Sequence, residues 1–135
     1  MFNLAHTVSR SILLEAPPEE VWAAIVDPAA LADWLADEVE LEPHEGGELV
    51  CRYEDGEERR GEVELVEEAE RLAFEWRREG CPPSRVELIV YAVAEGTRMI
   101  VVERGAAGTS SPLLAATWTA PLSSLRLTLG RLVLA

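Results

Sequence analysis

Cysteine is scarce in this chain of 135 residues, and its two copies, Cys51 and Cys81, form neither a CxxC pair nor a disulfide framework. The first residues, MFNLAHTVSRS, lack the basic and then apolar layout of a signal peptide. We therefore expect a protein of the reducing cytoplasm.

Long apolar runs and positive charge are also scarce. No run reaches the ~20 residues that span a bilayer, because Pro121, Arg126 and Arg131 interrupt the apolar stretch at residues 113–135. Twelve arginines and no lysine stand against 25 acidic residues, which leaves a net charge of −13. Such a chain repels polyanions, so we expect neither nucleic acid nor a membrane as a partner.

The sequence lacks the residue patterns typical of metal sites, phosphate-binding loops and covalent catalysis. His6 and His44 are isolated from each other and from the cysteines, so no metal site or cofactor is expected. The segment EGGE at residues 45–48 is a turn, with no helix after it to receive a phosphate. The serines of residues 110–111 and 123–124 have no histidine at a suggestive position, which argues against covalent catalysis.

The residues that are present describe one globular domain over residues 1–135, with 48% hydrophobic and 27% charged residues. Alternation over residues 7–14 predicts a first strand. Two prolines followed by Glu19 and Glu20 favour a helix over residues 19–26. Asp27 and Pro28 then form an N-cap and a first turn, which predict a second short helix over residues 29–35.

From residue 38 the hydrophobic period becomes two, which predicts about six antiparallel strands up to residue 105. Each strand pairs an apolar inner row with an outer row that is mostly charged. The predicted inner rows are Leu49, Cys51, Tyr53, Val63, Leu65, Leu72, Phe74, Trp76, Val86, Leu88 and Val90.

An amphipathic C-terminal helix follows, because large apolar residues recur at three- and four-residue steps from Trp118 to Leu132. Pro121 removes a backbone donor, so we expect either a kink near Thr117 or a helix that begins only near Ala120. This helix is the one long element left to cover a bent sheet. The predicted architecture is therefore α+β, with a curved sheet gripping the terminal helix.

The outer row of the last two strands is apolar as well. Its members are Ile89, Tyr91, Ile100 and Val102. A second apolar face implies a cover, either another element or a second subunit in a homodimer.

Four phrases in this order resemble a known superfamily: VSRSILLEAPPEEVWAAIVDPAALADWL, GEVELVEEAERLAFEWR, EGTRMIVVERG and ATWTAPLSSLRLTLGRL. They are similar to the opening, central hairpin, last strand and terminal helix of SRPBCC or START-like domains. The closest branch is that of activator of Hsp90 ATPase homologue 1-like proteins. The resemblance implies a helix-grip fold over essentially the whole chain, with a cavity between sheet and helix that often holds apolar molecules.

If that geometry holds, the pocket wall comes from Trp34, Leu49, Tyr53, Phe74, Trp76, Leu88, Met99, Val101, Trp118 and Leu122. The alternative is that these side chains simply fill the core.

Glu103 shares the parity of Met99 and Val101, so its carboxylate is expected to point inward near the mouth of the groove, where burial is costly unless the charge is paired. Solvent, or one of Arg52, Arg85 and Arg104, is the simplest partner.

Three functions follow. The first is binding of a small apolar molecule, as a carrier or sensor. The second is a protein-interaction module, either chaperone-associated or a homodimer through the outer row. The third is a cyclase-like enzyme that uses Glu103 and Tyr53 as acid and base. The charged run of residues 57–60 is interpreted as a solubilising hairpin tip.

Overall fold

A computed structural model describes residues 7–105 and 111–134, with side chains for residues 7–105 and 117–129. The strands are β1 (Thr7–Leu14), β2 (Glu38–Leu41), β3 (Glu48–Arg52), β4 (Glu58–Glu67), β5 (Arg71–Arg78), β6 (Ser84–Val93) and β7 (Gly96–Arg104). The helices are α1 (Pro18–Val26), α2 (Pro28–Leu31) and α3 (Ser111–Leu134). The order along the chain is the predicted one: a first strand, two short helices, six further strands and a terminal helix.

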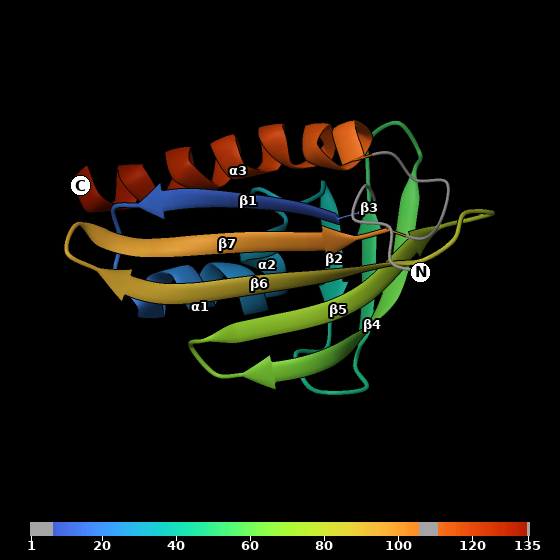
Figure 1. The fold of residues 1–135 in the computed structure, drawn as a ribbon, viewed down its shortest axis with the longest axis horizontal. Helices are drawn as coiled ribbons and strands as arrows, with labels where there is room; N and C mark the ends of the chain where they lie inside the picture. Colours follow the sequence, from blue (N-terminus) through green and yellow to red (C-terminus); the bar gives the residue numbers. More distant parts are fainter. Residues whose placement is uncertain (1–6, 106–110, 135) are drawn as a thin grey trace.

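The strands form one antiparallel sheet in the order β1-β7-β6-β5-β4-β3-β2. The first strand therefore pairs with the last strand, and β1 forms one edge of the sheet. Figure 1 shows the sheet bending strongly from β1 to β2, with α3 running lengthwise beside β1 and β7. The curved sheet and the helix it grips confirm the predicted helix-grip fold.

The core lies on the concave side of the sheet. Leu88, Met99 and Val101 from the inner rows belong to the same buried cluster as Trp118 and Leu125 of α3. Trp34, which follows α2, also joins this cluster. One apolar layer therefore connects the sheet with the helices, because these are the faces on which all the elements are apolar.

The α3 helix continues through Pro121 and does not begin there. Its Trp118, Leu122, Leu125 and Leu129 are all buried. Their burial on a shared face offsets the ~3 kcal/mol that an interior proline costs a helix. The expectation of a helix that begins only near Ala120 is therefore wrong.

Two local predictions are corrected. The second helix ends at Leu31, although Trp34 and Leu35 are buried as expected. In β4 the pairing register shifts between Val63 and Leu65. This bulge reverses the alternation, so Val66 packs against the core where the sequence predicts Leu65.

The outer row of β6 and β7 stays without a covering element among the described residues. Ile89, Ile100 and Val102 are half-buried and Tyr91 is 44% exposed. The expected cover by another element of the chain is therefore not found in residues 7–105 and 111–134.

Candidate functional site

Glu103 is the one buried carboxylate among the side chains that the structure describes, and it is 2% exposed. Trp118 Nε1 donates to its Oε1 at 2.8 Å. Trp76 Nε1 and the Ser84 hydroxyl donate to its Oε2 at 2.9 and 2.5 Å. Three hydrogen bonds thus replace the water that burial removes.

The arginines expected beside Glu103 lie elsewhere. Arg52 pairs with Glu40 and Glu58. Arg85 and Arg104 both pair with Glu87 on the outer face. The inward direction predicted for Glu103 agrees with the structure. The predicted partners, solvent or an arginine, are wrong, because Glu103 is buried and Arg85 and Arg104 lie on the other face of the sheet, where they pair with Glu87.

The two indoles that share Glu103 also contact each other. The Trp76 and Trp118 rings stack with centroids 6.0 Å apart and an interplanar angle of 24°. Phe74 meets the Trp76 ring edge-on at 5.2 Å. Since Trp118 belongs to α3, Trp76 to β5 and Glu103 to β7, this cluster holds the helix at a defined position against the sheet.

Arg59 covers the other side of this aromatic cluster. Its guanidinium carbon lies 4.6 Å from the centre of the Trp76 ring and 5.7 Å from that of Tyr53. Its Nε forms an ion pair with Glu57 at 3.2 Å. The Trp76 and Tyr53 rings therefore already hold an organic cation by a cation–π contact.

A groove of about 470 Å³ opens beside this cluster. Its walls come from the segment after α2, the β3–β4 hairpin, β5 and α3. The lining residues are Ala32, Asp33, Trp34, Leu35, Ala36, Asp37, Tyr53, Asp55, Glu57, Arg59, Trp76, Thr117, Trp118, Ala120, Pro121 and Ser124. The volume falls in the range of roughly 300–1,000 Å³ typical of small-molecule sites.

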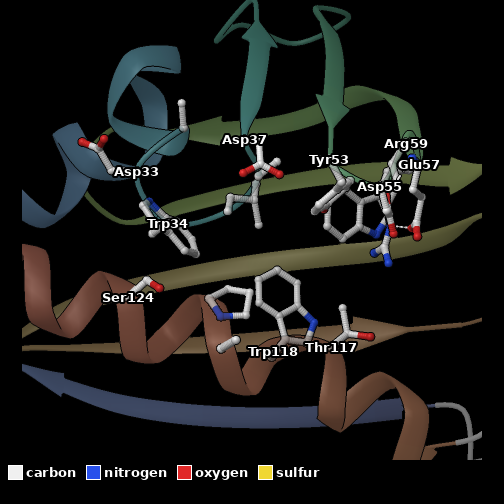
Figure 2. Close-up of a pocket in the computed structure, with 16 residues that line it drawn as sticks. Asp33, Trp34, Asp37, Tyr53, Asp55, Glu57, Arg59, Thr117, Trp118 and Ser124 are labelled. Atoms are coloured by element: carbon white, nitrogen blue, oxygen red, sulfur yellow. Dashed lines mark hydrogen bonds and ion pairs between the residues drawn. The ribbon is translucent and has the colours of Figure 1, made fainter.

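Figure 2 shows Trp34, Asp37 and Tyr53 on one side of the groove and Trp118 of α3 on the other. Trp34 is held from behind, because its Nε1 donates to the carbonyl oxygen of Ala24 at 2.9 Å. The indoles of Trp34, Trp76 and Trp118 are each 4% exposed or less, so they form the floor of the groove. Tyr53 and the acidic residues Asp37 and Asp55 stand nearer to solvent.

The predicted pocket residues divide into two groups. Trp34, Tyr53, Trp76 and Trp118 line the groove. The other six predicted residues lie in the buried core away from it: Leu49, Phe74, Leu88, Met99, Val101 and Leu122. All four that reach the groove are Trp or Tyr, whereas the five aliphatic residues and Phe74 fill the interior.

The charged lining of the groove is absent from the predicted pocket residues. Glu57 and Arg59 belong to the run that the sequence predicts to be a solubilising hairpin tip, and both line the groove. A signal for Arg59 was available, because it stands four residues before Val63 on the same face of β4. Asp33, Asp37 and Asp55 carried no such signal, since they lie in turns.

Two reactive side chains near the groove are kept protonated. Burial raises the pKa of the Tyr53 phenol well above its usual value, against a lowering effect of Arg59. Burial likewise raises the pKa of the Cys51 thiol to about 12, again opposed by Arg59. Tyr53 can therefore donate a hydrogen bond at neutral pH, and Cys51 is a poor nucleophile.

Metal ligands do not gather in the described part of the chain, where no group of three or more histidine, cysteine or acidic side chains is placed to hold an ion. None of the helices that were described is long and apolar enough to cross a membrane.

The antiparallel sheet curves around the C-terminal helix, and the groove opens between them. This arrangement defines a helix-grip domain of the SRPBCC class. In general, this is a ligand-binding fold. Residues 15–130 match the family model described as "Activator of Hsp90 ATPase homolog 1-like protein". The chain belongs to this family. None of the curated proteins matches it.

Several solved structures share the fold. DynU16, a protein of the dynemicin biosynthetic locus, is 26% identical with a TM-score of 0.85 over 93% of this chain, which spans 47% of the DynU16 chain. Protein MLL2253 from Mesorhizobium loti is 22% identical with a TM-score of 0.84, covering 93% of this chain and 97% of its own. CalU16 from Micromonospora echinospora is 25% identical with a TM-score of 0.71, covering 88% and 71%.

Proposed function

We propose that this domain binds a small, largely apolar molecule in the groove between the sheet and α3, as a carrier or sensor. The observation that carries the proposal is the groove of about 470 Å³ walled by Trp34, Tyr53, Trp76 and Trp118. Aromatic side chains offer rigid apolar area, and the Tyr53 hydroxyl adds a donor that can orient a ligand. The likeness to DynU16, from a biosynthetic locus, agrees with a ligand of this kind.

Blocking the groove tests the proposal. Ala120 lines the groove from α3, and Ser123 is exposed on the same helix outside it. Ala120→Phe should abolish uptake of the neutral dye Nile red, measured by its fluorescence, while Ser123→Phe should bind the dye as the wild type does. Dye binding that is equal in all three proteins, or absent from the wild type, would contradict the proposal.

The geometry argues against the acid and base roles of Glu103 and Tyr53. The Glu103 carboxylate lies behind the two indoles and does not line the groove, and both of its oxygens accept hydrogen bonds. The raised pKa of Tyr53 removes the phenolate that a base would need. Glu103 is better explained as the residue that positions the aromatic floor.

A homodimer through the outer face of the sheet is a second, independent proposal. It is favoured by Tyr91, which is 44% exposed within a row that continues to Ile89, Ile100 and Val102. Ile100→Glu should convert a dimer to a monomer on sizing chromatography. A wild-type protein that elutes as a monomer at high concentration would contradict this proposal and leave ligand binding unaffected. A chaperone-associated role, suggested by the family name, has no specific observation in its favour.

A further inference from the structure

The charges around the groove are strongly unequal. Of its five charged lining residues, Asp33, Asp37, Asp55 and Glu57 are acidic, and Arg59 is the only basic one. Glu57 pairs with Arg59 at 3.2 Å and also with Arg78, which does not line the groove, at 3.7 Å, so the charges of Glu57 and Arg59 largely cancel. Three carboxylates remain, and no ion pair is described for any of them.

Two of these carboxylates, those of Asp37 and Asp55, are held in place by backbone amides. Asp37 Oδ2 accepts a hydrogen bond from the Glu54 amide at 2.8 Å. Asp55 Oδ1 accepts one from the Glu57 amide at 2.8 Å. Each carboxylate has a second oxygen for which no hydrogen bond is described, so both can receive a donor from a bound molecule while keeping their positions.

Asp37 and Asp55 form what we call the acidic rim of the groove, and aromatic rings lie next to it. Trp34 and Tyr53 supply apolar ring surface next to Asp37, as Figure 2 shows. An apolar body with one positive end would therefore find ring surface below and carboxylates above.

We infer that the ligand of this groove is an organic cation: an aromatic or aliphatic body that carries an amine, held by the rings at its apolar end and by Asp37 and Asp55 at its charged end. This inference rests on the proposed ligand-binding function and specifies its ligand class. Charge complementarity of this kind selects among ligands of equal shape, because a neutral or anionic head group loses the attraction of the rim.

Three probes with the same ring system test the inference at pH 7 and low ionic strength. They are 2-naphthylmethylamine, 2-naphthylmethanol and 2-naphthoate, whose head groups are cationic, neutral and anionic.

Binding is followed by the NMR signals of the indole Nε1–H groups. Trp34, Trp76 and Trp118 line the groove and should shift, while Trp22 of α1 does not line it and serves as an internal control. The amine should bind about tenfold more tightly than the alcohol, and the difference should shrink in 0.5 M salt.

Paired variants separate the rim from the overall charge of the protein. Asp37→Asn/Asp55→Asn keeps the backbone-bonded oxygens and removes two charges at the groove. Glu15→Gln/Glu95→Gln removes two charges from exposed residues that do not line it. The first variant should reduce the preference for the amine to about threefold or less, and the second should leave it unchanged.

The outcomes distinguish the two proposals. If the alcohol binds as tightly as the amine, or if both double variants lose the preference equally, the inference is overturned and ligand binding stands. If none of the probes shifts the three groove indoles, the inference and the proposed function are both overturned.

Discussion

Glu103 is a buried acidic side chain whose three described partners are all neutral donors. Its neighbours on β7, Met99 and Val101, are buried and apolar, so an acid on this row is expensive to place there. The cost is offset because the carboxylate satisfies two buried indole N–H groups that have no other described acceptor. By accepting from Trp118 of α3 and Trp76 of β5, Glu103 therefore fixes the helix against the sheet and positions two indoles of the groove floor.

Glu103→Leu should lower the free energy of unfolding by about 3 kcal/mol, because two buried indole donors lose their acceptor. Glu103→Gln should cost less, since its carbonyl oxygen still accepts. Glu75→Gln, at an exposed position of β5, is the matched control and should change stability by less than about 0.5 kcal/mol. Urea titration measures all three, and a Leu variant as stable as the control would contradict the role given to Glu103.

The two cysteines should differ sharply in reactivity. Burial raises the pKa of Cys51 from 9.0 to about 12, whereas Cys81 is partly exposed. At pH 8 iodoacetamide should therefore modify Cys81 in the native protein, and both cysteines in urea, as peptide mass mapping would show. Equal modification of both in the native protein would be incompatible with the buried thiol.

The same shift predicts a loss of stability at high pH. A group whose pKa rises on folding stabilises the fold fully below its unfolded pKa and loses that contribution as the pH rises through the folded value. For Cys51 this window runs from about 9 to about 12. Cys51→Ala should therefore flatten the fall in melting temperature between pH 9 and pH 11, measured by circular dichroism, and an unchanged slope would count against it.

The α3 helix is held by one face only. Leu125 is fully buried against the sheet, and Leu127, two residues away, is 68% exposed. Leu125→Ala should lower the free energy of unfolding by about 2–5 kcal/mol, because it leaves a cavity under the helix. Leu127→Ala should change it by less than about 0.5 kcal/mol. Similar urea midpoints for both variants would show that the helix does not depend on this face.

Prediction from the sequence succeeded for elements whose pattern is local and regular. β1 spans Thr7–Leu14 as alternation predicts, and Asp27 caps α2 by accepting from the Ala29 amide at 3.0 Å. It failed at Leu65 and Val66, because a bulge shifts the register by one residue, and an alternating sequence pattern does not show where a bulge occurs. Of the two alternatives for Pro121, the helix that begins only near Ala120 is wrong, because burial of Trp118 and Leu122 overrides the local effect of the proline.

The charge of the entire chain has its own consequence. A net charge of −13 produces long-range self-repulsion, while the surface ion pairs contribute only about 0–1 kcal/mol each. Salt weakens both, and the repulsion is the larger effect. The melting temperature should therefore rise between 10 and 200 mM NaCl, measured by circular dichroism, with potassium chloride as a control for ion identity. A fall with salt would show that the ion pairs dominate.

The linear order of residues by itself determined the elements, their order, the buried rows outside the β4 bulge and the inward direction of Glu103. Those properties depend on spacings of two, three and four residues, which every strand and helix repeats. The tertiary structure alone decided which donors reach Glu103 and that four of the ten predicted pocket residues meet in an open groove. It also decided that turn residues supply the acidic rim. These contacts join segments far apart in the chain, so they depend on sheet curvature, on the β4 bulge and on the docking of α3, none of which a local pattern encodes.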